Sequence, residues 1–584
     1  MDQRKAQILE ILARERPETS RPVALVYHAL ARLALGTDRE TAVRFLEDGL
    51  DVIDMFTAPA YARVCTRHRD GIPSSTFEAI RETLTRKMSY RGLYDSVHTE
   101  NHKVMLAVAR LLTAQAFPGD RIEGTRASVA YQAALDWLRA WAASRMVYGL
   151  VEFHSPVYAL TYVSPLMILR DCATDPEVRR MAEMMVDYLA IEHATSNLNG
   201  IYAGGHSRLY DQYAVETRAH LSHAWSYLFC GSPVLNGDVG LALAMTTADS
   251  DYRPHPAIIA TATDRRQPYA LHERHAEMVS NSVPVDIGRY TWMTDSYCLS
   301  SLYGASWPDH QHRWSLKVNS DNPHGTIFTN QPNKSAKAGY WTGASEYEHL
   351  LQHEGVLLAT YHIPAGDPHP LMRGHLPLVA ERWLPAPKTL SGESQPQWLF
   401  LHVGPAFVAI RPLAPFRLDR KPYGAELTRQ STSRTREYWE LTSACRRTGV
   451  IVEAARAADW PSFDAFVTSV RGRKTHVDGD RIAVTYTTVT GAVLRLENPG
   501  PPPDAPSYLQ SDGTVPVITT HLHYAVQRPK ATATINGVDL DHADWPLMDC
   551  PFVHSDFGSA VIRVEHEGRG VELDFRRWTK KAWG

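Results

Sequence analysis

The sequence predicts a protein in two parts, a helical N-terminal half followed by an antiparallel β half. Up to about residue 270 the apolar residues recur at i, i+3, i+4 and i+7, the spacing of one face of a helix. After about residue 275 they alternate with polar residues, as in half-buried strands. A chain of 584 residues is long for one hydrophobic core, so we expect a helical domain over 1–270, an antiparallel β domain over 271–490 and a C-terminal β subdomain over 491–584.

The helical half contains segments of similar length joined by short polar loops. Helices are expected at 24–34, 42–55, 77–88, 103–116, 127–146, 158–172 and 176–191. Start signals precede three of them, at Thr37-Asp38, Ser75 and Asp175-Pro176. Helices of equal length with short connections pack as antiparallel hairpins. We therefore expect either a solenoid or a closed toroid of helix pairs.

The β half contains strand-period segments separated by turn residues. Strands are expected at 314–318, 356–361 and 482–489, with turns at Asp478-Gly479, Asp512-Gly513 and Asn536-Gly537. The proline-rich stretch 498–504 is expected to be a stiff loop at a subdomain boundary.

The composition is that of a soluble globular protein without a nucleic-acid surface. The 61 basic and 64 acidic side chains nearly balance, and no polybasic run occurs. A polyanionic substrate would therefore meet a local positive patch, not a global field. The N-terminal segment lacks the apolar core of a signal peptide, and no run is apolar enough to span a membrane. We expect a cytoplasmic protein without a membrane or nucleic-acid partner.

The six cysteines are scattered singly, without a C-x-x-C pair. This spacing disfavours a zinc ribbon and a disulfide scaffold, so buried free thiols are expected.

Two polar clusters border helical segments. Asn101 and His102 stand at the start of the 103–116 segment, and His154 and Tyr158 lie about fifty-five residues later. Asn101 also suits a helix cap and His102 a surface position, so a structural role stays open. If the 154–158 segment is helical, His154 and Tyr158 share a face. Glu100 and Lys103 are interpreted as solvated neighbours.

Two further clusters carry residues suited to binding a charged ligand. The 202–213 segment combines Gly204-Gly205 with Tyr202, His206, Arg208 and Tyr210. Glycines let the backbone approach a ligand, and arginine offers a planar fork that matches a carboxylate. In the β half, His310 and His312 would point to the same side of a strand, where they could bind a metal or a substrate.

The order and spacing of these clusters over about residues 90–365 resemble the heparinase II/III-like and alginate lyase superfamily of polysaccharide lyases. The resemblance implies an incomplete (α/α) toroid followed by antiparallel β-sandwich domains. It implies that Asn101 and His102 neutralise the carboxylate of a uronate and that Tyr158 is the general acid. It also places His310-x-His312 at the start of the β half. Trp314 stands where the family's strand carries aspartate, which argues against a metal site built on that carboxylate.

These residue types suit β-elimination from an acidic oligo- or polysaccharide. Donors on the substrate carboxylate stabilise the charge that develops when the adjacent carbon loses its proton, and Asn101, His102 and Arg208 are candidates. Tyr158 would protonate the leaving oxygen. A tyrosine base would need a lowered phenol pKa. The candidate bases are Tyr158 itself, His206, His310 and Tyr340, and the candidate substrate-binding residues are His154, Tyr202, Arg208 and Tyr210. No cofactor is expected, and a structural divalent metal in the β half is left open.

Two other functions fit the same sequence. A glycoside hydrolase would need two carboxylates about 5–10 Å apart across a sugar ring. The acidic residues near the clusters are Asp95, Glu100, Asp211 and Glu216. A carbohydrate-binding protein without activity is the second alternative, although aromatic residues at 9% are ordinary. Only a lyase would release an unsaturated uronate that absorbs ultraviolet light.

Overall fold

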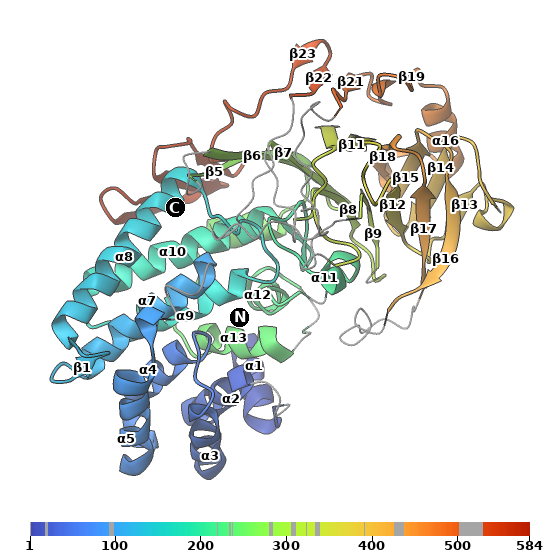
Figure 1. Ribbon diagram of the computed structural model, residues 1–584. Helices are drawn as coiled ribbons and strands as arrows, with labels where there is room; N and C mark the ends of the chain where they lie inside the picture. The colour runs from blue at the N-terminus through green and yellow to red at the C-terminus, as the bar shows by residue number, and fades with distance from the viewer. Residues whose placement is uncertain are drawn as a thin grey trace.

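The computed structural model is described for residues 2–17, 22–92, 99–218, 220–232, 235, 238–278, 284–304, 311–322, 324–332, 339–390, 392–424, 437–500 and 530–584. It contains a helical N-terminal part and a larger part made of sheets (Figure 1). The helices of the N-terminal part are α1 (Asp2–Arg14), α2 (Pro22–Leu35), α3 (Arg39–Leu50), α4 (Ala58–Arg67), α5 (Ser74–Glu82), α7 (Glu100–Ala116), α8 (Ala127–Tyr148), α9 (Ala159–Cys172), α10 (Pro176–Thr195), α11 (Asp211–Val215), α12 (His223–Phe229), α13 (Asp238–Ala248) and α14 (Pro256–Thr263).

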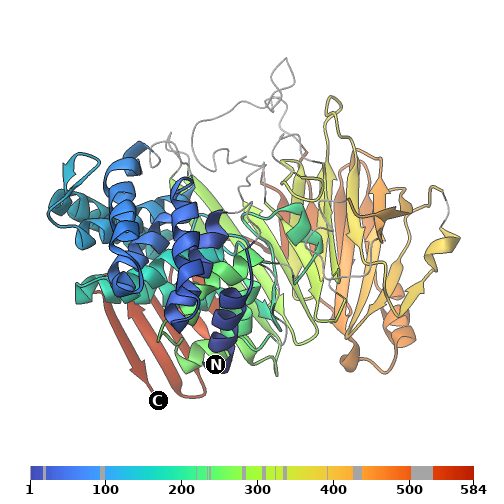
Figure 2. The same ribbon diagram turned by 90° about the horizontal axis from the view of Figure 1, so that it is seen from below.

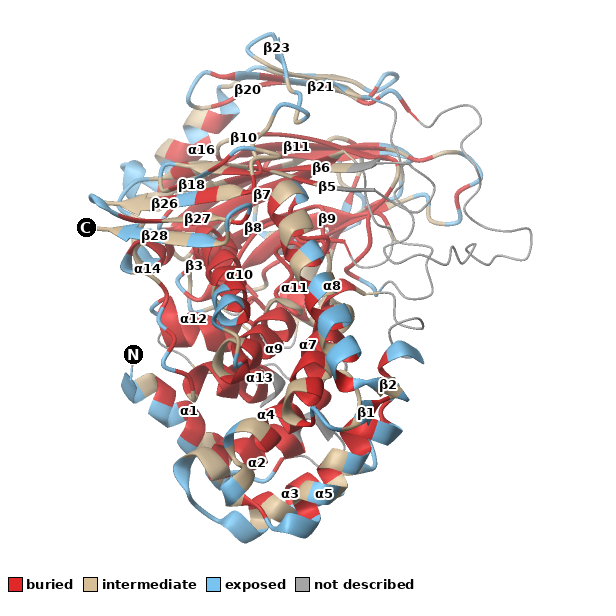
Figure 3. Ribbon diagram, turned by 90° about the vertical axis from the view of Figure 1, so that its left-hand side faces the viewer, coloured by how far each residue is buried: buried red, intermediate tan, exposed pale blue. Residues whose placement is uncertain are grey.

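Neighbouring helices pack in pairs, as their spacing in the sequence predicts. The pairs α2 and α3, α7 and α8, and α9 and α10 are in contact, and α7, α9 and α13 also contact helices of other pairs. In Figure 3 α9, α10 and the strands beside them are largely buried, whereas α1, α3 and α5 each have an exposed face. The seven expected helices are confirmed with ends shifted by a few residues.

One helix start differs in a way that affects the site. Helix α9 begins at Ala159, and Tyr158 is its N-cap residue. His154 has a φ of 44°, in the left-handed region, so the chain turns there. The 154–158 segment is therefore not helical, so the condition under which His154 and Tyr158 would share a helix face is not met. A left-handed residue cannot continue a right-handed helix.

Two antiparallel sheets form most of the remaining chain. Among the described residues one sheet has the order β16 (Arg417–Pro422), β17 (Glu437–Ser443), β12 (Met372–Leu376), β9 (Thr326–Asn330), β8 (Trp314–Val318), β7 (Tyr297–Gly304), β6 (Pro284–Met293), β5 (Tyr269–Met278), β24 (Met548–Cys550), β25 (Val553–Ser555), β26 (Val561–His566), β27 (Arg569–Asp574) and β28 (Thr579–Trp583). The second has the order β10 (Glu348–His353), β11 (Val356–His362), β18 (Arg447–Arg456), β15 (Ala406–Pro412), β14 (Leu399–Val403) and β13 (Arg382–Leu384).

The two sheets share a hydrophobic core. Leu299 on β7 and Leu316 on β8 belong to the same buried cluster as Leu357 on β11 and Val452 on β18. Alternate residues of β8 point the other way, toward the helical part: the hydroxyl of Ser315 donates to the carbonyl of Gly204 at 2.8 Å. Strand alternation thus gives β8 one face for the sheet core and one for the helical part.

The smaller elements complete the β part. A third sheet has the order β19 (Thr475–Asp478), β20 (Ala483–Thr487), β21 (Val493–Glu497), β22 (Thr532–Ile535) and β23 (Val538–Asp539), and α16 (Phe463–Arg471) belongs to the core beneath it. Two short hairpins, β1 (Arg121–Ile122) with β2 (Thr125–Arg126) and β3 (Asn197–Leu198) with β4 (Ile201–Tyr202), lie in the helical part. The turns at Asp478-Gly479 and Asn536-Gly537 connect hairpins as expected, and Asp512-Gly513 lies outside the described residues.

The C-terminal strands do not form a separate subdomain. Strand β24 pairs with β5, so β24–β28 extend the sheet that begins at Tyr269 (Figure 2). A boundary at residue 491 would also divide β20 from β21, which are hydrogen-bonded neighbours. The expected third domain over 491–584 is therefore corrected, because strand pairing joins residues that are distant in sequence.

Two expectations from composition can be compared with the structure. All six cysteines are free, and Cys65, Cys172, Cys230 and Cys298 are buried. Within the described ranges no helix is both long and apolar enough to cross a membrane.

Candidate active site

A pair of tyrosines lies at the centre of the candidate site. The hydroxyl oxygens of Tyr158 and Tyr210 are 2.5 Å apart, and both side chains are half-buried. Burial raises the pKa of Tyr158 well above 10; Arg208 opposes this shift and Tyr210 and Glu152 add to it. The Tyr158 phenol therefore remains protonated at neutral pH and is suited to donate a proton.

Arg208 lies against the ring of Tyr158. Its guanidinium carbon is 4.6 Å from the ring centroid, and its Nη1 is 2.6 Å from Oε1 of the fully buried Glu152. The turn before α9 is attached to the same segment, because the hydroxyl of Ser155 donates to the carbonyl of Arg208 at 2.9 Å and accepts from the amide of Tyr158 at 3.2 Å. The 202–213 cluster and the 154–158 cluster thus meet in space, as the sequence predicts.

His102 faces the same region from the first turn of α7. Its ring meets Phe56 edge-on with centroids 5.2 Å apart. Burial and the charge of Arg208 lower its pKa to about 4. The imidazole is therefore neutral at pH 7, so it can accept a proton but adds no positive charge for a substrate carboxylate.

Asn101 has a supporting position in the structure. It is 0% exposed, and its Nδ2 donates to the hydroxyl of Thr161 at 3.1 Å. That hydroxyl in turn donates to the carbonyl of Tyr158 at 2.7 Å. The amide group expected to bind a substrate carboxylate is therefore used to hold the turn that carries Tyr158.

Two buried carboxylates, those of Glu100 and Glu152, lie behind these residues. Neither Glu152 nor this pair was predicted from the sequence. Glu100 and Glu152 lie on either side of the Tyr162 hydroxyl, which is 3.0 Å from Glu100 Oε2 and 2.8 Å from Glu152 Oε2. Glu100 also accepts from the indole of Trp141 at 2.7 Å and pairs with Arg145 at 3.3 Å. The interpretation of Glu100 as a solvated neighbour is wrong, because these buried donors need a carboxylate partner.

Of the acidic residues considered for a hydrolase, the three that the structure describes do not form an accessible pair. Glu100 and Glu216 are buried, and Asp95 lies outside the described residues. The Asp211 carboxylate accepts backbone amides of the 340–341 segment. A hydrolase would need two carboxylates that reach a sugar ring.

His154 and Tyr202 belong to a fully buried polar network. His154 Nε2 is 2.6 Å from Glu273 Oε1, and the hydroxyl of Tyr202 donates to Glu192 Oε1 at 3.2 Å. Burial alone would raise the pKa of Glu273, but His154 and Arg289 outweigh burial and lower it to about 2. This network joins the helical part to β5 and β6, and the side chains of His154 and Tyr202 are fully buried within it.

His206 is also buried. Its Nδ1 donates to the carbonyl of His154 at 2.6 Å, and its backbone pairs with that of His312. Burial lowers its pKa well below 6.5. His310 lies outside the described residues, and the ring of His312 meets Phe328 edge-on with centroids 4.3 Å apart. Trp314 is buried, and its side chain supplies no carboxylate.

Tyr340 is joined to the site through Asp211, the neighbour of Tyr210. The Asp211 carboxylate accepts the backbone amides of Tyr340 at 2.5 Å and Trp341 at 2.8 Å. Burial raises the pKa of the Tyr340 phenol, and its hydrogen bond to Glu440 adds to the shift. The raised pKa keeps the Tyr340 phenol protonated in the unliganded protein, so Tyr340, like Tyr158, is disfavoured as the base.

Two groups of described residues have metal-ligand atoms close together. They are His154 with Glu273 and His275, and Asp264 with His566 and Glu567. In each group an arginine already pairs with the carboxylates: Arg289 with Glu273, and Arg266 with Asp264 and Glu567. These ion pairs account for the carboxylates, so neither group fits a structural metal well.

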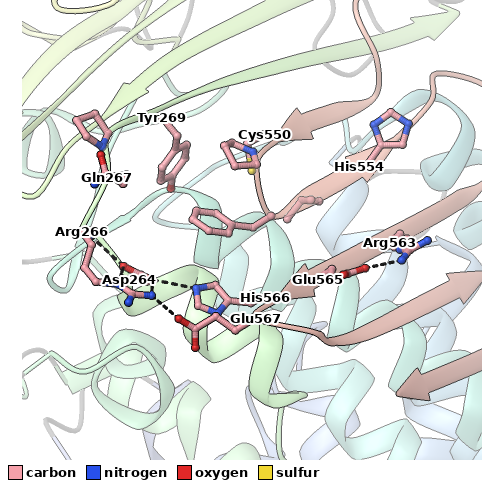
Figure 4. A pocket seen from close by; sticks show the side chains of 14 residues that line it. Asp264, Arg266, Gln267, Tyr269, Cys550, His554, Arg563, Glu565, His566 and Glu567 are labelled. Carbon is pink, nitrogen blue, oxygen red and sulfur yellow. Dashed lines mark hydrogen bonds and ion pairs between the residues drawn. The ribbon is translucent and has the colours of Figure 1, made fainter. Parts of the chain in front are cut away.

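A cavity of about 690 Å³ lies away from the tyrosine pair, where the end of the helical part meets β5 and β24–β26 (Figure 4). Its charged residues pair with one another: Arg266 is 2.6 Å from both Asp264 and Glu567, and Arg563 contacts Glu565. It lacks the tyrosines and the neutral histidine of the candidate site, so we place the chemistry at Tyr158.

Of the comparisons with known proteins, only the one with solved structures found matches. No protein-family model and no curated protein matches the chain. The solved structures that resemble it include polysaccharide lyases, the class that the sequence resemblance indicated.

One is a point mutant of chondroitin AC lyase from Streptomyces coelicolor A3, with 10% identity, a TM-score of 0.43, and coverage of 98% of this chain and 88% of that chain. Another is a heparinase III, with 9% identity, a TM-score of 0.39, and coverage of 83% and 84%. Likenesses at this level assign no activity, which has to be argued from the side chains of this chain.

Proposed function

We propose that the protein is a lyase that cleaves an acidic glycan by β-elimination at the tyrosine pair, on helices that would form the incomplete toroid implied by the sequence resemblance. The observation that carries the proposal is the arrangement of Tyr158, Tyr210 and Arg208, which come from two separate segments. A protonated phenol, a second phenol in contact with it and a permanent cation against its ring suit proton donation beside an anionic substrate.

Each residue has a defined role in the proposed reaction. Arg208 attracts the carboxylate of the uronate, which lets the adjacent carbon C5 lose its proton more easily. Neutral His102 accepts that proton, and electrons from the C5–H bond form the C4=C5 double bond. The C4–O4 bond breaks, and the hydroxyl of Tyr158 protonates the departing O4.

Tyr210 completes the cycle. When Tyr158 has given its proton to O4, it is left as a phenolate, which burial strongly disfavours. Because the Tyr210 hydroxyl is 2.5 Å away, it can pass a proton to Tyr158 and recover one from solvent. The raised pKa also favours Tyr158 as the acid over Tyr158 as the base, two roles that the sequence left open.

The test is a screen of the purified protein against alginate, glucuronan, heparinoids and hyaluronan, with product detected by ultraviolet absorbance. We expect an unsaturated product from at least one acidic glycan. Y158F should lower kcat by about 100- to 10,000-fold, the contribution of a general acid. Its melting temperature should change little, because the ring and its contact with Arg208 remain.

Y210F is the matched control for the relay. It removes the second hydroxyl and keeps the ring, so we expect a smaller loss of kcat than in Y158F. Reducing sugar released without ultraviolet absorbance would contradict elimination and favour hydrolysis. Near-wild-type activity of Y158F would refute the assignment of the acid.

A further inference from the structure

Tyr340 is an exposed aromatic residue whose backbone is held in place beside the candidate site. Its side chain is 43% exposed, whereas its amide is bound by the Asp211 carboxylate. A Cβ added at Gly339 would lie 2.2 Å from Asp211 Oδ1, so the close approach of this loop requires glycine. Asp211 directly follows Tyr210 in the chain, which fixes Tyr340 relative to the tyrosine pair.

The ring of Tyr340 is oriented by two contacts. Its hydroxyl donates to Glu440 Oε2 at 2.7 Å, and the guanidinium carbon of Arg373 lies 3.6 Å from its ring centroid. Glu440 is itself buried and accepts from the hydroxyl of Tyr438 at 3.1 Å. The exposed part of the ring is therefore pre-organised, which lowers the entropy lost when a ligand binds.

Arg373 is a nearly buried cation without a direct ion pair among the described residues, although its charge opposes the rise that burial causes in the pKa of the nearby Asp211 carboxylate. Arg373 is 8% exposed, and its Nε donates to Asn330 Oδ1 at 3.3 Å. In contrast, the buried Arg63 and Arg289 each contact at least one carboxylate. A nearly buried guanidinium that no described carboxylate pairs with directly can still take an anionic partner, and its place beside an exposed tyrosine ring points to an anionic ligand.

We propose that Tyr340 and Arg373 form a subsite for a second acidic sugar of the substrate, which contacts the exposed part of the tyrosine ring and pairs its carboxylate with the guanidinium. This subsite rests on the proposed function, because it takes the same chain of sugars that reaches Tyr158. It assigns Tyr340 to binding, not to proton transfer. The substrate would be an oligosaccharide with acidic residues at more than one position.

The experiment measures binding without turnover, in protein that already carries Y158F. Titration calorimetry with alginate and glucuronan tetrasaccharides compares this protein with versions that also carry Y340A, Y340F or R373Q. We expect Y340A and R373Q to raise the Kd for at least one tetrasaccharide by about tenfold, which corresponds to about 1.4 kcal/mol. Y340F keeps the ring and should bind nearly as well as its parent.

Tyr148 provides a matched control, because it is 44% exposed and lies on α8 in the helical part. Y148A should leave the Kd unchanged. Circular dichroism and melting temperatures show whether Y340A and R373Q are folded. If R373Q does not fold, the comparison of Y340A with Y340F still tests the ring. Unchanged binding in folded Y340A, or no binding of either tetrasaccharide by the parent, would overturn the subsite.

The subsite and the proposed reaction can fail separately. Ultraviolet-absorbing product from wild-type protein, with the same KM in Y340A, would support the lyase and overturn the subsite. A weaker Kd in Y340A, without absorbing product from any glycan, would support the subsite and contradict the elimination reaction.

Discussion

Tyr158 and His102 show opposite pKa shifts from the same cause, the loss of water around each side chain. Burial raises the pKa of the phenol and lowers that of the imidazole to about 4, because it disfavours the charged form of both. The sequence places both residues in one candidate site but contains no information on burial. Their division into acid and base is therefore a result of the structure.

The pH dependence of the reaction follows from the state of His102. The base must be neutral, so kcat/KM should stay constant as pH falls from 7 and decline only near pH 4. R208Q removes the nearby cation that helps to lower this pKa, so its acid limb should move to higher pH. The pH profile of both proteins, with His102 followed by NMR, measures the effect. An acid limb at the same pH in both proteins would contradict the role of His102.

The first turn of α7 and the turn before α9 are held together by buried polar groups. Glu100 and Glu152 sit against Tyr162, and Asn101 reaches the carbonyl of Tyr158 through Thr161. Helical spacing predicts these helices to within a few residues. It does not predict which polar residues at the helix ends point into the protein, because the same residue types also occur as helix caps and as solvated side chains.

Removal of Glu100 should destabilise the protein. E100A leaves Arg145 and the indole of Trp141 without their carboxylate, so we expect a loss of about 3–5 kcal/mol in the free energy of unfolding. The matched control is E10A, in which an exposed carboxylate of α1 that pairs with Arg14 is lost, and the expected change is within about 0.5 kcal/mol. Chemical denaturation measures both. Equal stability of the two variants would contradict the buried role of Glu100.

The C-terminal strands and the helical part are brought together by the sheet that contains β5. Strands β24–β28 extend it, and Lys580 on β28 lies 2.7 Å from Asp187 and 2.7 Å from Glu183 on α10. Burial raises the pKa of Asp187, and Lys580 opposes that shift. The C-terminal strands therefore stabilise the helical part as well as the sheet.

Loss of Lys580 should weaken this connection. K580A leaves the buried Asp187 carboxylate without its cation, so we expect a cost of about 1–3 kcal/mol at neutral pH. The cost should become smaller at acidic pH, where Asp187 binds a proton in the variant. K530A is the matched control, because Lys530 is exposed and pairs with the exposed Asp541. Thermal unfolding at two pH values tests this, and a pH-independent difference would contradict it.

The sequence by itself determined the change from helices to strands near residue 270 and most element positions, and its resemblance to a lyase family predicted that the segments carrying His102, Tyr158 and Arg208 meet. Periodicity and spacing are local properties, which a single chain reveals without its fold. Only the tertiary structure decided that Asn101, His154 and His206 are buried, that Glu152 holds Arg208, and that Tyr340 stands beside Arg373. Those facts depend on which helix and sheet faces pack together. The spacing of residues along the chain does not show how far each side chain is removed from water.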